Sequence, residues 1–557
     1  MSTNISKAKR EELLRQVAEI RNKLMEHQDE NTNQLLVYLS NIEKDINGKK
    51  YGLVFEEHRE AVDELLECHV PVLVEEESLK LDNGGQQNFL IEGDNLASLK
   101  LLEKTHKGKI DLIYIDPPYN TGNKDFVYDD AFVDSEDKFK HSKWLSFMKV
   151  RLEIAHRLLT HRGMIMISIN DIELYNLKVL LDSVFGETNF LTNMIWQSTP
   201  GSNTGKTIKT VTEYVLVYAK DIKQNLVNTI KNYDDKKYDL FDEYEKERGK
   251  YILNKLDRRM TGSHYSEALN YPIQTPDGDR IYPGGELEKQ KNWNWRWSSQ
   301  KVQWGSKNGF IVFKKIKDKW SIYFKQYQFV DNNNNRIERF LPYQNLIKED
   351  GVNSARGNQE VMDIFQSKAF DYPKPLNLIG YLLKISPFDK ITILDFFAGS
   401  GTTGHAVMKL NAEDGGKRKF ILCTNNENNI CRDVTYERIK RVIEKEGYKA
   451  SLKYYKVDFV PISEQVYYEY ADKLLLHIKE LVELENGLDF DGNKKVAICL
   501  TDEDLQEYVN SLGNSTTYKA VYVGHDVFVT PEIESKLNCL GIKINIIPDY
   551  YYSELRG

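Results

Sequence analysis

The sequence predicts an α/β protein with a mostly parallel central sheet that is interrupted by an inserted region. Two stretches, residues 88–220 and 374–448, carry short apolar runs separated by segments with helical spacing. Such runs are typical of buried parallel strands joined by helices. The intervening residues 221–365 are rich in Lys, Asp and Asn and contain the turn-forming sequences PDGD and PGG. This change in composition predicts a separate domain with β character and mobile loops.

The apolar runs give the predicted strands in order. The first stretch contains FLI (89–91), IDLIYI (110–115), MIMISI (164–169) and YVLVYA (214–219), all of which we expect to be buried parallel strands. The second contains ITILDFF (391–397), a Gly-rich turn, a helix and KFILC (419–423). A chain of this length divides into several cores. We therefore predict an N-terminal helical region (1–75), a first sheet half (76–225), an insertion (226–365), a second sheet half (366–450) and a small separate C-terminal α/β domain (456–557).

The N-terminal region has helical periodicity over residues 7–47, with polar residues between two apolar sets. This pattern predicts a helical hairpin that serves as a cap or a dimer arm. The apolar positions are Leu13, Leu14, Val17, Ile20 and Leu24 in the first set and Leu35, Leu36, Leu39, Ile42 and Ile46 in the second.

Composition excludes several classes of protein. The five Cys residues form no CxxC pair, which argues against a metal site or a disulfide framework. No signal-peptide core and no apolar run of about 20 residues is present, so we expect a soluble, cytoplasmic protein without a membrane segment. The net charge is −8, but residues 286–325 contain ten Lys and Arg against three acids, a local +7. A phosphate-binding face needs basic residues only locally.

The sequence Asp116-Pro117-Pro118-Tyr119 follows the predicted strand 110–115 directly. The carboxyl ends of parallel strands carry the reactive groups of open α/β sheets. The Asp116 carboxylate and the Pro117 carbonyl are a pair of acceptors that can hold both hydrogens of an exocyclic amine such as adenine N6. Two prolines stiffen this loop, and Tyr119 offers a ring on which an extruded base can stack. We predict that these four residues are catalytic.

A second motif, ILDFFAGSGTTGHAVMKL (393–410), reads as a strand, a Gly-rich turn and a helix. Gly399 and Gly401 permit close backbone approach, and Thr402 and Thr403 are predicted to cap the helix. The spacing also fits a dinucleotide fingerprint. A pyrophosphate would be repelled by Asp395, however, whereas the α-ammonium group of S-adenosylmethionine (SAM) would be attracted to it. SAM is therefore the favoured cofactor.

Taken together, these motifs resemble the amino-methyltransferases in which the catalytic motif precedes the cofactor motif. The resemblance covers residues 88–220 and 370–448, including FLIEGDNLASL and YPKPLNLI. It implies a Rossmann-like, SAM-dependent methyltransferase fold with a circularly permuted, seven-stranded, mostly parallel sheet. In it, Asp94 contacts the cofactor adenine, and Lys374 and Pro375 lie near the methionine moiety. The predicted cofactor-binding residues are Asp94, Lys374, Pro375, Asp395, Phe397, Gly399, Ser400, Gly401, Thr402 and Glu427.

More narrowly, the chain resembles the modification subunit of type III restriction–modification systems. This implies adenine-N6 methylation of duplex DNA, a homodimer and a restriction endonuclease partner. A solitary DNA methyltransferase, a cytosine-N4 or RNA methyltransferase and a catalytically idle DNA-reading subunit are the alternatives. The insertion becomes a target-recognition domain, with five Trp that either contact bases or form its core. The predicted DNA-binding residues are Arg296, Lys314, Lys315 and Lys317.

Overall fold

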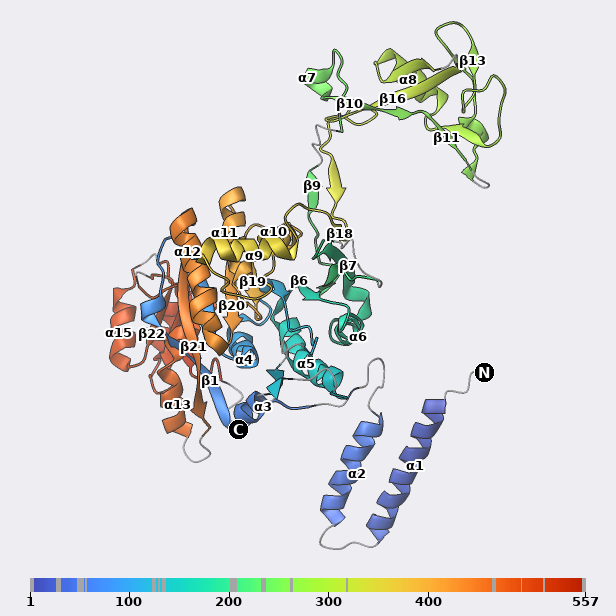
Figure 1. Cartoon of the computed structure of the whole chain (residues 1–557). Coiled ribbons are helices and arrows are strands. Elements are labelled where there is room, and N and C mark those ends of the chain that lie inside the picture. The colour runs from blue at the N-terminus through green and yellow to red at the C-terminus, as the bar shows by residue number, and fades with distance from the viewer. Residues whose placement is uncertain are drawn as a thin grey trace. The chain divides into compact units, whose positions relative to one another are not determined.

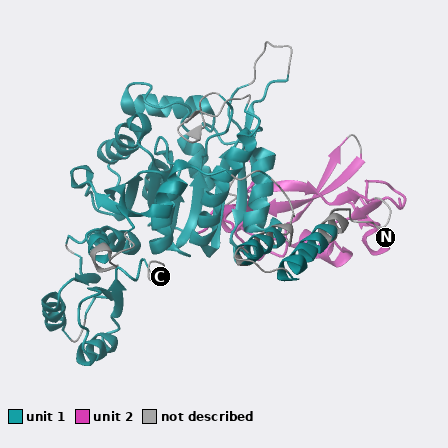
Figure 2. Cartoon of the chain, turned by 90° about the horizontal axis from the view of Figure 1, so that it is seen from below, with its two compact units in different colours: residues 1–226, 345–383, 388–557 teal, residues 227–344, 384–387 magenta. Residues whose placement is uncertain are grey.

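The computed structural model separates the chain into two compact units, each of which is described by itself (Figure 2). Unit 1 comprises residues 1–226, 345–383 and 388–557, and unit 2 comprises residues 227–344 and 384–387. The residues described are 5–26, 32–47, 55, 58–122, 127–128, 131–132, 137–200, 208–231, 237–260, 264–316, 319–462, 467–491, 493–513 and 516–552.

Unit 1 is built on a ten-stranded sheet in the order β1-β21-β2-β20-β19-β3-β6-β8-β7-β18 (Figure 1). The sheet therefore has ten strands where the resemblance implied seven. The six strands predicted from apolar runs are its central members β2, β20, β19, β3, β6 and β8, and β7, β18, β21 and β1 extend them at the two edges. The strands are β1 (His69–Glu75), β2 (Gln86–Glu92), β3 (Ile110–Ile115), β6 (Leu159–Ile169), β7 (Phe190–Gln197), β8 (Thr212–Ala219), β18 (Leu346–Ile347), β19 (Thr392–Asp395), β20 (Lys419–Thr424) and β21 (Ala450–Pro461).

Two features of this sheet correct the sequence prediction. Strand β8, which contains YVLVYA, is antiparallel to both β6 and β7 and was wrongly predicted to be parallel. Its burial on both faces gives it the same apolar run as a parallel strand. In addition, residues 345–365 were assigned to the insertion but lie in unit 1. There β18 pairs with β7, and α9 (Ser354–Phe365) packs against α12 (Glu437–Glu446).

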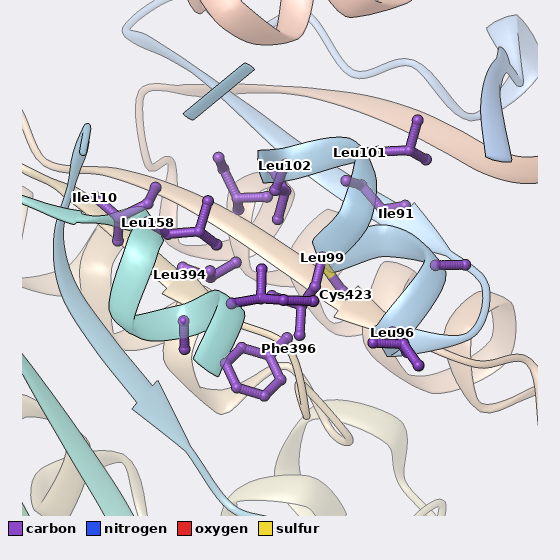
Figure 3. Close-up of a cluster of buried hydrophobic side chains, with 14 of the residues drawn as sticks. Ile91, Leu96, Leu99, Leu101, Leu102, Ile110, Leu158, Leu394, Phe396 and Cys423 are labelled. Carbon is purple, nitrogen blue, oxygen red and sulfur yellow. The ribbon is translucent and has the colours of Figure 1, made fainter. Parts of the chain in front are cut away.

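Helices cover both faces of the sheet. On one face, α4 (Asn95–His106) and α5 (Lys140–Leu158) bury Leu99 and Leu158 against β19 and β20 (Figure 3). Cys423 points to this face, while its strand neighbours Phe420 and Leu422 line the other, where α11 (Thr402–Asp414) packs through Gly404. The further helical segments are α3 (Ala61–Cys68), η1 (Glu77–Leu79), α6 (Leu174–Phe185), η2 (Glu187–Asn189), α10 (Leu376–Leu383), η5 (Glu427–Asn429) and the π-helical η6 (Ile430–Tyr436). The short strands β4 (Val127–Tyr128) and β5 (Ala131–Phe132) pair with each other in antiparallel orientation.

The predicted N-terminal helices are present as α1 (Ile5–Glu26) and α2 (Thr32–Asn47), which pack against each other. Arg21 and Glu43 form an ion pair between them at 2.7 Å, and Val17 and Leu39 are buried. The predicted turn lies outside the described residues. Among the described residues, none of the helices combines the length and hydropathy that a membrane crossing requires.

The C-terminal region has its own parallel sheet, yet it is part of unit 1. Its strands pair in the order β22-β23-β24, with a local core around Val521 and Leu537. However, α14 packs on α4 and β1, and Leu481 and Tyr551 belong to the main core. The C-terminal region thus keeps a sheet and a local core of its own and also packs on the main sheet within unit 1, through apolar contacts that the sequence did not show. The elements are α13 (Tyr467–Leu475), α14 (Ile478–Asn486), β22 (Val496–Cys499), α15 (Asp502–Ser511), β23 (Ala520–Gly524), α16 (Pro531–Cys539) and β24 (Lys543–Ile547).

Unit 2 is a small, mostly β structure around the three-stranded antiparallel sheet β10-β16-β15. Trp295 and Trp297 lie in its core, and Trp304 and Trp320 pack against that core. Its elements are β9 (Thr229–Lys231), α7 (Glu245–Arg248), β10 (Tyr251–Lys255), β11 (Asp257–Arg259), η4 (Glu267–Leu269), β12 (Ile273–Gln274), β13 (Arg280–Ile281), β14 (Trp293–Trp295), α8 (Ser299–Lys307), β15 (Ile311–Ile316), β16 (Lys319–Tyr327) and β17 (Phe340–Pro342).

Candidate active site

The two sequence motifs leave the sheet from neighbouring strands. Strands β3 and β19 are parallel and directly paired, with Leu394 opposite Ile113. The catalytic loop Asp116–Tyr119 follows β3, and the glycine loop 396–401 follows β19. Both loops therefore emerge at the same carboxyl edge of the sheet, where parallel strands place ligand sites. Residues that are nearly 280 positions apart in the sequence form one site.

Asp116 has one paired and one unpaired carboxylate oxygen. Its Oδ2 lies 2.8 Å from the Nζ of Lys374, whereas its Oδ1 is buried and has no hydrogen-bond partner among the residues that the structure describes. A buried acceptor without a partner costs free energy unless a ligand supplies the donor. Behind it, the Trp144 indole donates a hydrogen bond to the Pro118 carbonyl at 2.7 Å, and Pro117 is buried. The loop is thus held from the protein side while Oδ1 remains available.

Lys374 is surrounded by the catalytic loop and Glu213 of β8. Its Nζ lies 3.6 Å from Glu213 and 4.8 Å from the centre of the Tyr119 ring, and the Tyr119 hydroxyl donates to Glu213 at 3.1 Å. Burial by itself lowers the pKa of Lys374, but the charges of Asp116 and Glu213 outweigh burial and leave the pKa raised. The lysine is therefore a buried cation.

The glycine loop adopts the backbone that its composition allows. Gly399 and Gly401 have φ values of 48° and 74°, a region that other residues rarely enter. Gly401 is the N-cap of α11, so the prediction that Thr402 and Thr403 cap this helix is wrong. Their hydroxyls bond elsewhere: Thr402 donates to the Lys374 carbonyl at 3.2 Å, and Thr403 donates to Asp395 at 2.5 Å.

Asp395 ends β19 with its carboxylate only 2% exposed. Besides Thr403, the Phe397 amide donates to it, at 3.0 Å. Burial raises the pKa of Asp395 from its usual 3.8 to about 7, although both hydrogen bonds favour the charged form. The negative charge of Asp116 raises it further. A cationic ligand at this position would supply the missing counter-charge.

Sequence reasoning missed the cation that supports the glycine loop. Arg438 of α12 is fully buried and donates to the Thr402 hydroxyl at 2.7 Å and to the Ser400 hydroxyl at 3.2 Å. Burial lowers its pKa to about 10. Thr435 of the π-helical segment η6 donates to the Gly399 carbonyl at 2.6 Å. No local pattern marks these residues, because they follow the loop by about 35 positions and reach it only through folding.

A second missed group anchors the end of the catalytic loop. Asn120 has a φ of 56° and is buried, and its amide donates to the Glu173 carboxylate at 2.6 Å. Glu173 is fully buried, and its carboxylate also pairs with the His141 ring at 2.6 Å and accepts from Asn176 at 2.8 Å. This network fixes the position where the chain leaves the site.

The remaining predicted cofactor residues take different places. Asp94 is the N-cap of α4 and accepts from two backbone amides, at 2.7 and 3.2 Å. It stands at the carboxyl end of β2, the same sheet edge as the glycine loop. Glu427 is exposed in η5, just beyond β20. The Phe397 ring packs against Phe147 at 5.8 Å, and Pro375 is buried.

In unit 2, the predicted DNA-binding residues do not form one row. Lys314 and Lys315 are exposed neighbours on β15, so their side chains point to opposite faces of the sheet. Lys315 is paired with Asp277 at 3.0 Å. Arg296 is exposed and donates to a backbone carbonyl. Lys317 lies outside the described residues.

Residues 110–436, which include both loops and Lys374, match a family model described as DNA methylase. The chain belongs to the DNA methylase family. It is 36% identical to the type II methyltransferase M.KpnI of Klebsiella pneumoniae over 60% of this chain and 79% of that protein. It is also 33% identical to the StyLTI Mod subunit of Salmonella typhimurium, a type III restriction–modification enzyme, over 65% of this chain. With the EcoPI Mod subunit of Escherichia phage P1, the identity is 30% over 62% of this chain. The chain spans 56% and 58% of these two Mod subunits.

Proposed function

We propose that this DNA methylase transfers a methyl group from SAM to N6 of an adenine that is extruded from duplex DNA. The observation that carries the proposal is the buried, unpartnered Oδ1 of Asp116 at the same sheet edge as the glycine loop. The exocyclic amine of adenine is a hydrogen-bond donor that would satisfy this oxygen.

Different residues of the site bind the cofactor and orient the target base. Asp395 offers a buried carboxylate to the α-ammonium of SAM, and the glycine loop allows close backbone approach to the cofactor. Bound there, SAM supplies an electrophilic methyl carbon. Asp116 Oδ1 and the Pro117 carbonyl accept the two N6 hydrogens and direct the nitrogen lone pair. The Tyr119 ring offers a stacking surface for the extruded base.

We further propose that the protein acts in a restriction–modification system, as the cytoplasmic modification subunit of a type III enzyme. The identities to several Mod subunits support this assignment. Such a role includes a homodimer and a restriction endonuclease partner. A solitary DNA methyltransferase is the second candidate, and it is favoured by the greater share of M.KpnI that the chain covers. Unit 2 serves target recognition in either case.

The test is methyl transfer from tritiated SAM to unmethylated genomic DNA by the wild type and by Asp116→Ala. We expect Asp116→Ala to lose about 100-fold or more in rate, because a preorganised acceptor is removed, while SAM affinity is retained. Asp371→Ala, which changes an exposed carboxylate in the same unit, is the matched control. Near-normal turnover by Asp116→Ala would reject the catalytic assignment.

The methylated nucleoside that the reaction yields identifies the target base. Digestion of the methylated DNA to nucleosides should release N6-methyladenine, and N4-methylcytosine in its place would reject the adenine assignment. Single-molecule sequencing of a genome that expresses this chain alone gives the sequence context. Co-expression with a type III nuclease subunit, followed by size-exclusion chromatography with light scattering, separates the type III assignment from the solitary one.

A further inference from the structure

We propose that Lys374 and Glu213 form a positioning pair that aims the catalytic carboxylate and couples it to the glycine loop. The inference rests on the proposed function and deepens it. Sequence resemblance places Lys374 near the methionine part of the cofactor. The structure assigns the lysine ammonium to Asp116 instead.

The geometry of Asp116 gives the first argument. Its Oδ2 is held by Lys374 at 2.8 Å, while its Oδ1 is buried and unpartnered. A carboxylate that is fixed through one oxygen cannot rotate freely, so the other oxygen keeps one direction. A charge-assisted hydrogen bond of this kind is about twice as strong as a neutral one. Lys374 therefore fixes the direction in which Oδ1 of Asp116 faces the target amine.

Glu213 gives the second argument, because its carboxylate is a second partner of the lysine ammonium. Its carboxylate lies 3.6 Å from Nζ and accepts a hydrogen bond from the Tyr119 hydroxyl at 3.1 Å. Glu213 belongs to β8 and Tyr119 to the catalytic loop, so neither adjoins Lys374 in sequence. A lysine that has only 12% of its side chain exposed, between two carboxylates and over an aromatic ring, has few alternative positions.

The backbone of the same residue gives the third argument. The Lys374 carbonyl accepts a hydrogen bond from Thr402, the first residue of the helix that follows the glycine loop. The Thr402 hydroxyl is itself held by buried Arg438. One residue thus contacts the catalytic carboxylate through its side chain and the cofactor loop through its main chain. A shift of the glycine loop is transmitted to Asp116 over a single residue.

The charges around the pair predict an unusual pattern of substitution effects. Lys374 lies within 2.8 Å of Asp116 and 3.6 Å of Glu213, and the negative charges of both carboxylates raise its pKa. In the wild type, Glu213 attracts the lysine and is favourable. Without the lysine, the charge of Glu213 repels that of Asp116, and the hydrogen bond from Tyr119 is its remaining favourable contact in the site. Glu213 should therefore favour activity when residue 374 is lysine and oppose it when the lysine is removed.

The experiment is a double-mutant cycle of Lys374→Met and Glu213→Gln, with kcat, KM for unmethylated genomic DNA, SAM affinity and Tm measured for each variant. Each single variant should lose about 10- to 100-fold in kcat, since each removes a charged partner, with SAM affinity within about threefold. In the Lys374→Met background, Glu213→Gln should cost nothing or restore activity. Lys374→Arg should recover part of the rate. Lys368→Met, an exposed lysine six positions away, is the control.

The outcomes separate the inference from the function on which it rests. Loss of SAM binding in Lys374→Met would assign the lysine to the cofactor and overturn the proposal. The proposal would also be overturned if the loss of kcat in the double variant equalled the product of the losses in the two single variants. A wild type that does not methylate DNA would reject the proposed function itself. If Lys374→Met fails to fold, Glu213→Gln and Lys374→Arg still decide, because both keep the size and most hydrogen bonds of the native residue.

Discussion

Lowering the pH from 7 to 6 should weaken SAM binding, because the carboxylate proposed to bind the cofactor ammonium becomes protonated in that interval. Asp395 is almost fully buried, and burial raises its pKa to about 7 in the unliganded protein. With this pKa the charged fraction falls from about one half at pH 7 to about one tenth at pH 6, which raises the apparent Kd about fivefold. The cofactor ammonium stays protonated throughout, since α-amino groups have a pKa of about 7.7–8.0.

Isothermal titration calorimetry at several pH values measures this effect directly. Asp395→Asn is the control, because it keeps the acceptor oxygen but has no charge to lose. The variant should bind SAM more weakly at pH 7.5 and show a nearly flat dependence between pH 7 and 6. An equal pH dependence in the wild type and in Asp395→Asn would refute the reasoning, because the titrating group would then lie elsewhere.

The ionisation of Asp395 also changes the stability of the folded protein with pH. The pKa of Asp395 is raised in the folded protein from 3.8 to about 7, so the native state binds the proton more tightly than the unfolded state. Stability from this group is therefore lost as the pH rises through that window, by at most about 4 kcal/mol. Without cofactor, Asp395→Asn should raise Tm more at pH 8 than at pH 5.

Three further predictions concern the support of the site. Trp144→Phe should lower the free energy of unfolding by about 1–3 kcal/mol in urea titrations, since it leaves the Pro118 carbonyl of the catalytic loop without its donor; an unchanged unfolding midpoint would show that this hydrogen bond does not hold the loop. Arg438→Met should weaken SAM binding by about tenfold or more, because a charged donor to the Ser400 and Thr402 hydroxyls is removed; Arg441→Met, which changes a half-exposed arginine of the same helix that pairs with Glu437, should not. Neutralising Lys314, Lys315 and Lys317 together should reduce the slope of log K against log salt by about 0.9 for each phosphate that is no longer neutralised, and an unchanged slope would remove these residues from the DNA interface.

Local patterns in the sequence identified the two loops correctly. The apolar run 110–115 and the prolines after it predicted a strand with Asp116 at its end, and the structure has that strand. Gly399 and Gly401 were expected at a tight turn and have positive φ. Both features depend on residues within a few positions of each other, which is the range over which strand periodicity and turn geometry act.

The tertiary structure decided what surrounds these loops. Strand β8 has the apolar pattern of a parallel strand but is antiparallel, because direction depends on the connection and not on burial. Of the five tryptophans of the insertion, Trp295 and Trp297 are core residues and Trp304 and Trp320 pack against that core, which composition left open. Lys374, Glu213 and Arg438 become site residues only when segments far apart in sequence meet at one sheet edge. Charge pairing acts through space, so its partners leave no periodic trace in the chain.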